Sequence, residues 1–124
     1  MAKTFLIVDD EVRIGEILEE FIYDCYGEDS HVIKALNGKE AINTVDKEDH
    51  IDLIFLDIIM PELNGIKFIE ILRGEKGMTT PILVVSASVE EAKDKTSKFF
   101  KVNYLSKPIF KEEFDEAVSK LVSP

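Results

Sequence analysis

Cysteine is almost missing from this sequence, and the lack limits the kinds of protein it can be. Cys25 is the single cysteine, so no disulfide can form within the chain. One free cysteine fits a reducing compartment, and we expect it to be a small core-side residue late in the first helix. No apolar run approaches the ~20 residues of a membrane-spanning helix. The N-terminal MAKTF lacks the pattern of a secretory signal. These absences predict a cytoplasmic protein without a membrane anchor.

Basic residues are also scarce. The chain has 15 lysines and arginines against 25 acids, for a formal charge of −10. This balance argues against direct binding to nucleic acid, which calls for a basic surface. It fits a divalent cation or a basic protein partner. At 124 residues, without repeats or linkers, the chain is expected to form one domain over 1–124 with no effector domain.

Short apolar runs alternate with longer amphipathic stretches along the whole chain. The runs are rich in leucine and β-branched residues and read as strands: 5–8, 31–36, 53–56, 81–87 and 102–106. The stretches between and after them repeat their apolar residues at helical spacing. Five strands alternating with five helices predict an α/β fold, a parallel sheet with helices on both faces.

Polar side chains follow four of the five predicted strands. The first strand ends at Asp9 and Asp10, the third at Asp57, the fourth at Ser86, and the fifth leads to Lys107. Ligands bind beyond the carboxyl ends of the strands in such sheets, so these side chains are expected to converge. The strand that begins at residue 31 delivers no such group and is expected to lie to one side.

Three converging carboxylates need a counter-charge. Two of them ~4 Å apart repel by roughly 4 kcal/mol at an effective dielectric near 20. An all-oxygen site of this kind suits Mg²⁺ or Mn²⁺, and since neither His31 nor His50 falls at this edge, zinc is not expected. Lys107 adds a cation and Ser86 a hydroxyl. The set predicts a phosphoryl-transfer site in which Asp57 can become an aspartyl phosphate.

Four motifs together carry a family resemblance over essentially the whole chain. They are VDDE (8–11), LDIIMPELNG (56–65), VVSAS (84–88) and YLSKP (104–108). With these motifs in this order, the sequence resembles a response-regulator receiver domain of bacterial two-component signalling. The resemblance implies a flavodoxin-like (βα)5 fold, a doubly wound five-stranded parallel sheet with strand order 2-1-3-4-5.

The resemblance also implies roles for the acids. Asp57 would be the phosphoacceptor. Asp9 and Asp10 would hold Mg²⁺ together with Asp57, with Asp10 the favoured direct ligand and the backbone carbonyl of Ile59 completing the set. The phosphoryl donor would be a histidine kinase or a histidine phosphotransferase.

Further roles follow from the same resemblance. Lys107 would contact the phosphoryl oxygens, with a cis peptide before Pro108. Ser86 would move toward the phosphoryl group and Tyr104 would fill the vacated space, which forms a two-state switch. The fourth helix, fifth strand and fifth helix would then present a changed surface to a downstream protein.

Plainer interpretations stand beside these roles. Asp9 and Asp10 could cap a helix, and Asp57 could be a turn residue. Ser86 could satisfy nearby backbone groups, and Tyr104 could be an ordinary core or surface tyrosine.

The sequence departs from the family pattern before the fifth strand. Phe99, Phe100 and Lys101 stand where receivers commonly have small residues and a glycine, and a bulky residue is poorly placed there if the backbone needs positive φ. We therefore expect the fourth helix to be short, shifted or mobile. The two phenylalanines could be core residues or could serve a partner. Ile59 cannot orient a hydrolytic water, so the phosphoryl group should last at least minutes.

Our main hypothesis is a stand-alone receiver, a phosphoacceptor whose own chemistry is limited to self-phosphorylation and self-dephosphorylation. A phosphohydrolase built on an aspartyl nucleophile would carry a second acid at position 59, where this chain has isoleucine. A pseudo-receiver, binding partners without phosphorylation, would have lost some of the site residues, and all are present. A receiver fragment of a longer regulator remains an alternative.

Overall fold

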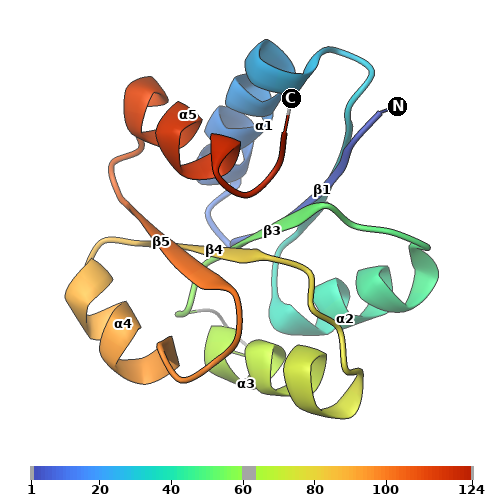
Figure 1. Ribbon diagram of the computed structural model, residues 1–124, viewed down its shortest axis with the longest axis vertical. Coiled ribbons are helices and arrows are strands. Elements are labelled where there is room, and N and C mark those ends of the chain that lie inside the picture. The colour runs from blue at the N-terminus through green and yellow to red at the C-terminus, as the bar shows by residue number, and fades with distance from the viewer. Residues whose placement is uncertain (1, 60–63, 124) are drawn as a thin grey trace.

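The computed structural model describes residues 2–59 and 64–123 and contains one parallel sheet (Figure 1). Its spatial order is β2-β1-β3-β4-β5, and every neighbouring pair is parallel. The predicted fold class and strand order are therefore confirmed. The strands are β1 (Thr4–Val8), β2 (His31–Ala35), β3 (Leu53–Leu56), β4 (Ile82–Ser86) and β5 (Val102–Ser106).

Helices cover both faces of the sheet. Figure 1 shows α1 and α5 on one face and α2, α3 and α4 on the other. The helical elements are α1 (Val12–Tyr26), α2 (Gly38–Lys47), α3 (Gly65–Glu70), the π-helical continuation η1 (Ile71–Glu75), α4 (Val89–Thr96) and α5 (Lys111–Ser119). No helix in residues 2–59 and 64–123 is long and apolar enough to cross a membrane.

The core is divided by the sheet into two clusters. Side chains alternate along a strand, so Leu6 and Val8 join the cluster under α2, α3 and α4, whereas Phe5 and Ile7 join the one under α1 and α5. All four are buried. This two-sided burial explains why the central strands are apolar throughout.

Aromatic side chains are concentrated in the cluster under α1 and α5. The rings of Phe55 and Phe114 stack with centroids 5.8 Å apart, and Phe21 meets Phe114 edge-on at 5.4 Å. These contacts tie β3 to α5 and α5 to α1. Cys25 is partly buried against the same cluster, in the core-side position expected for it.

The strand boundaries follow the sequence pattern closely. The ranges 53–56 and 102–106 coincide with β3 and β5, β1 and β2 differ from their predicted ranges by one residue at one end, and β4 is shorter than predicted by one residue at each end. The peptide before Pro108 is cis, as the resemblance implied. Residues 60–63 of the motif LDIIMPELNG lie outside the described residues.

The corner between α4 and β5 carries the departure noted in the sequence. Helix α4 has eight residues, and Lys101 adopts a positive φ of 51°, the conformation for which glycine is better suited. Phe99 packs against the core, while Phe100 is exposed. The guanidinium of Arg73 donates to the carbonyl of Phe100 at 2.8 Å and so connects this corner to η1. A shift or mobility of α4 remains a prediction.

Candidate phosphoacceptor site

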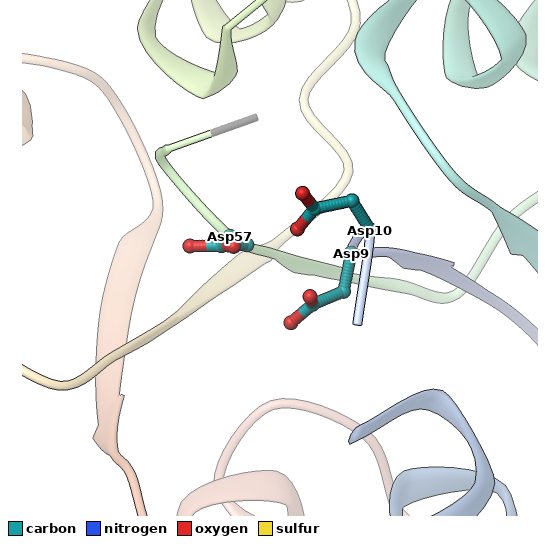
Figure 2. A group of neighbouring side chains, drawn as sticks. All are labelled: Asp9, Asp10 and Asp57. Carbon is teal, nitrogen blue, oxygen red and sulfur yellow. The ribbon is translucent and has the colours of Figure 1, made fainter. Parts of the chain in front are cut away.

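Three aspartates meet at the carboxyl ends of β1 and β3 (Figure 2). Asp9, Asp10 and Asp57 each offer a carboxylate oxygen, and these oxygens lie within 4.8 Å of one another. The juxtaposition agrees with the sequence argument, because β1 and β3 are adjacent and end at the same edge. Asp10 is exposed and Asp9 is buried, while the side chain of Asp57 is 13% exposed.

Backbone hydrogen bonds fix two of these acids just beyond the strands. The N–H of Asp9 donates to Ala35 at 3.1 Å and that of Asp57 to Val8 at 2.9 Å, so the ladder continues one residue past each strand. Asp9 Oδ1 also accepts from the N–H of Glu11 at 2.8 Å, at the start of α1. Asp9 therefore contributes both to the turn into α1 and to the acidic cluster. A role at the start of the helix and a role in binding a metal are compatible for this residue.

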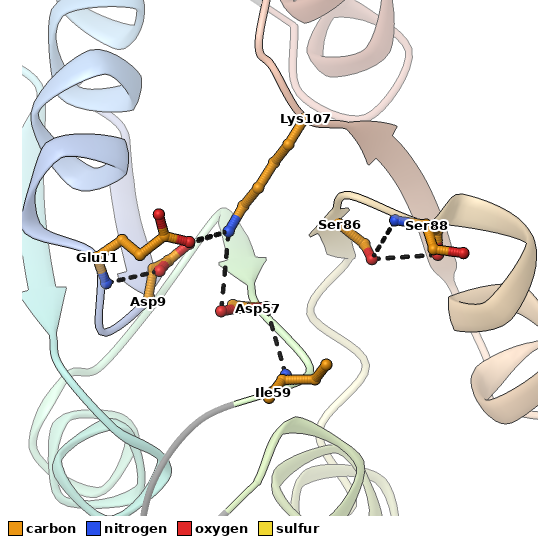
Figure 3. A network of polar contacts seen from close by, with 7 residues as sticks. All are labelled: Asp9, Glu11, Asp57, Ile59, Ser86, Ser88 and Lys107. Atoms are coloured by element: carbon orange, nitrogen blue, oxygen red, sulfur yellow. Dashed lines mark hydrogen bonds and ion pairs between the residues drawn. The ribbon is translucent and has the colours of Figure 1, made fainter.

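Lys107 reaches into the cluster from the end of β5 (Figure 3). Its Nζ lies 2.8 Å from Glu11 Oε1, 3.3 Å from Asp9 Oδ2 and 3.8 Å from Asp57 Oδ2, and its side chain is 14% exposed. The position of Lys107 was predicted from the sequence, whereas the contact with Glu11 was not. Glu11 is the last residue of the motif VDDE, and this position was the available indication that it lies near the cluster.

Burial and mutual repulsion change the ionisation of this cluster. Desolvation, followed by the charge of Asp9, raises the pKa of Asp57 to about 6, although Lys107 and the N–H of Ile59 act in the opposite direction. Desolvation also raises the pKa of Asp9, against the N–H of Glu11 and the charge of Lys107. Burial alone would lower the pKa of Lys107, but the hydrogen bond to Glu11 and the surrounding carboxylates outweigh it and raise that pKa.

The donor set fits a hard divalent cation. Asp9 Oδ2 is buried and accepts no hydrogen bond from the residues that the structure describes, and its nearest cation is Lys107 at 3.3 Å. Such an atom has lone pairs free for a metal, and the oxygens of Asp10 and Asp57 lie close to it. An all-carboxylate cluster without histidine or cysteine suits Mg²⁺ or Mn²⁺.

Gly65 allows α3 to start directly against the backbone of Asp57 and Ile58 at the end of β3. A Cβ at this position would lie 2.6 Å from the carbonyl oxygen of Asp57 and 2.7 Å from Cα of Ile58. The Gly65 N–H donates to the Ile58 carbonyl at 2.9 Å. The sequence gives no sign of this close approach, because it arises only when α3 packs against the end of β3.

The hydroxyl groups of Ser86 and Tyr104 have different hydrogen-bond partners. Ser86 Oγ donates to the carbonyl of Ser88 and accepts from its N–H, each at 3.1 Å (Figure 3). The hydroxyl of Tyr104 lies 2.7 Å from Oγ1 of the buried Thr96 in α4. The Ser86 hydroxyl thus has the backbone partners of its plainer interpretation in this structure, and its switch role stays a prediction.

A pocket of about 490 Å³ opens beside Asp57. Figure 3 shows Ser86 and Ser88 on the opposite side of Asp57 from Asp9 and Glu11. The side chain of Ile59 is 79% exposed at the pocket. Lys107 also lines it, and the remaining lining residues come from the β1–α1 connection, the segment after β3, the β4–α4 connection and α4: Asp10, Glu11, Ile58, Ala87, Glu91, Ala92 and Lys95.

Residues 5–119 match the family described as the response regulator receiver domain, and the chain belongs to this family. The transcriptional regulatory protein CiaR of Streptococcus pneumoniae is 32% identical over 120 residues, which cover 94% of this chain and 50% of CiaR. The chain spans about half the length of the curated relatives it matches.

Two solved structures illustrate the likeness. The response regulator TrrA of Thermotoga maritima, in complex with Mg(2+)-BeF, is 31% identical with a TM-score of 0.81, over 97% of this chain and 99% of TrrA. The chemotaxis protein CheY4 of Vibrio cholerae has a TM-score of 0.85 at 24% identity, over 98% of this chain and 100% of CheY4, and this second likeness concerns the fold.

Proposed function

We propose that this receiver accepts a phosphoryl group on Asp57 from a phosphohistidine donor, a histidine kinase or a histidine phosphotransferase, in a Mg²⁺-dependent reaction. The observation that carries the proposal is the placement of Asp57, with two further aspartates within 4.8 Å and Lys107 Nζ 3.8 Å from its Oδ2. TrrA supports it, because that relative was solved with Mg(2+)-BeF.

The residues divide the chemistry between them. A carboxylate oxygen of Asp57 attacks phosphorus, and the bond from phosphorus to the donor nitrogen breaks. Lys107 is close enough to reach a phosphoryl oxygen after a small movement toward Asp57, and its positive charge stabilises the charge that develops there. The Ser86 hydroxyl would leave Ser88 to donate to another of these oxygens.

Asp9, Asp10 and Asp57 would hold the Mg²⁺ ion, with the Ile59 carbonyl as a further ligand. The bound ion would supply positive charge that offsets the repulsion among the acids and neutralises phosphoryl oxygens. The free lone pairs of the buried Asp9 Oδ2 fit this assignment.

The output of the domain is proposed to be a protein contact on α4, β5 and α5. Tyr104 on β5 is hydrogen-bonded to Thr96 of α4, so a movement of Tyr104 would change the contacts of α4 on this surface. We favour a receiver that acts alone, but the match to only about half of CiaR also supports a receiver module of a longer regulator. In either case we place no nucleic-acid contact on this acidic domain.

The test is intact mass after incubation with acetyl phosphate, with Mg²⁺ or with excess EDTA. Wild type should gain one phosphoryl group only with Mg²⁺, and Asp57→Asn should gain none. The control Asp49→Asn removes an exposed acid away from the site and should behave as wild type. A wild type that gains no mass on fast quenching would support a pseudo-receiver instead.

A further inference from the structure

The pocket beside Asp57 extends along α4 to a charged pair. Glu91 and Lys95 lie one helical turn apart, their Oε1 and Nζ are 3.4 Å apart, and both line the pocket with Asp57. Their side chains are 63% and 47% exposed, so they are accessible to a small molecule that enters. Neither residue belongs to the acidic cluster or contacts Lys107 among the interactions described above.

Attack by Asp57 fixes where the leaving group of a phosphodonor must go. In phosphoryl transfer the attacking and leaving oxygens are roughly in line, so the leaving group lies on the far side of phosphorus from Asp57. Asp9 and the buried part of Lys107 occupy the inner side. The leaving group is therefore directed outward into the open pocket, which α4 borders.

We propose that Lys95 and Glu91 form a leaving-group subsite that selects small phosphodonors by charge, with Lys95 favouring donors whose leaving group is an anion. The proposal rests on the proposed function, because it requires Asp57 to be the nucleophile. Of the described residues that line the pocket, Lys95 and Lys107 are the cations, and Lys107 already has three carboxylates within 4 Å. Among the residues that the structure describes, Lys95 pairs with one carboxylate, that of Glu91.

Two donors that carry the same phosphoryl group but different leaving groups isolate the effect of Lys95 and Glu91 on the leaving group. With acetyl phosphate, a bond forms between Asp57 and phosphorus, the phosphorus–oxygen bond to the acetyl group breaks, and acetate leaves with the electron pair. With phosphoramidate, the phosphorus–nitrogen bond breaks, and the nitrogen, protonated by solvent, leaves as neutral ammonia. Both give the same aspartyl phosphate, so only the leaving group differs.

The experiment measures initial phosphorylation rates with each donor by intact mass, at fixed Mg²⁺ and ionic strength. Lys95→Gln should lower the ratio of the acetyl phosphate rate to the phosphoramidate rate by about two- to fivefold, the range for a partly exposed charge interaction. Glu91→Gln should raise this ratio. Lys95→Arg keeps the charge and should keep most of the ratio.

Matched controls on the same part of the chain make the same change in net charge. Lys98→Gln and Asp94→Asn alter exposed residues that do not line the pocket, and they should leave the ratio at the wild-type value. A ratio that is unchanged in Lys95→Gln, or that falls equally in Lys98→Gln, would overturn the subsite while Asp57 chemistry stands. A wild type that neither donor phosphorylates would overturn the proposed function and the subsite with it.

Discussion

The hydroxyl of Tyr104 donates a hydrogen bond to Oγ1 of Thr96, 2.7 Å away on the inner side of α4. The direction follows from the hydroxyl of Thr96, whose single hydrogen is already donated to the Ala92 carbonyl at 2.7 Å. Thr96 is fully buried. Tyr104, which is proposed to move during switching, is therefore hydrogen-bonded to α4, the helix whose surface would change when it moves.

Replacing Thr96 by valine tests this attachment. Thr96→Val keeps the shape but leaves the Tyr104 hydroxyl without its partner, so the free energy of unfolding should fall by about 1–3 kcal/mol. Urea denaturation measures the loss, and the ring signals of Tyr104 in NMR should shift. The control Thr44→Val removes a similar helical hydroxyl bond, to Glu40, at a more exposed site and should lose less. Equal losses in the two variants would contradict the role.

The acidic cluster should make the metal-free protein less stable as the pH rises. The pKa of Asp57 is near 6 in the folded protein and ~3.9 when unfolded, so the folded state binds this proton more tightly. Stability therefore declines between about pH 4 and 6, and the full effect above that range is roughly 3 kcal/mol.

Asp57→Asn removes that ionisation. In EDTA at pH 7 the variant should unfold at higher denaturant concentration than wild type, and the difference should shrink toward pH 4. Added Mg²⁺ should narrow the gap by stabilising wild type more strongly. A wild type more stable than Asp57→Asn in EDTA at pH 7 would show that repulsion in the cluster is not significant.

A methyl group at position 65 should disturb the backbone at Asp57 and Ile58. In Gly65→Ala the new Cβ would meet backbone atoms of Asp57 and Ile58 at distances that force a shift. We expect a loss of about 1–3 kcal/mol of stability and slower phosphorylation by acetyl phosphate. Gly74→Ala is the control, because its Cβ would meet nothing within 4 Å, and it should be neutral or slightly stabilising. Unchanged phosphorylation in Gly65→Ala would contradict the argument.

Glycine, the residue that receivers commonly have before the fifth strand, should be more stable at position 101 than lysine. A lysine at φ 51° is strained by about 1 kcal/mol, and glycine relieves that strain. We expect Lys101→Gly to stabilise the domain slightly, measured by thermal unfolding. Lys98→Gly, in the same turn but without a positive φ, should destabilise it. If both variants lose stability, the strain at this corner is negligible.

The apolar Ile59 should prolong the life of the phosphoryl group. Its exposed side chain borders the pocket but offers no polar atom to position a water molecule. We expect the wild-type aspartyl phosphate to persist for at least minutes and Ile59→Asn to shorten its lifetime, as measured by the decay of the phosphorylated mass after donor removal. A lifetime of seconds in wild type, unchanged in Ile59→Asn, would refute this.

Sequence reasoning succeeded where the fold is decided by local pattern. Apolar runs located the strands, and parallel strands end at one edge, so Asp9, Asp57 and Lys107 could be brought together without coordinates. The strand order came from the resemblance, because periodicity does not specify which strands are neighbours.

Contacts between distant segments were not accessible in the same way. The bond between Glu11 and Lys107 joins residues 96 positions apart, and the partner of Tyr104 depends on how α4 lies over the sheet. The approach of Gly65 to Asp57 depends on how the start of α3 packs against the end of β3. Each follows from packing geometry, for which the sequence contains no periodic signal.

The division of the core by the sheet has a mechanical consequence. Thr96, Tyr104 and Ala92 all belong to the α4 side, whereas the stacked rings of Phe55 and Phe114 lie on the other. Rearranging α4 would leave that aromatic packing intact. A movement confined to α4 would therefore alter contacts on one face of the sheet only, while Phe55 and Phe114 continue to join β3 to α5 on the other face.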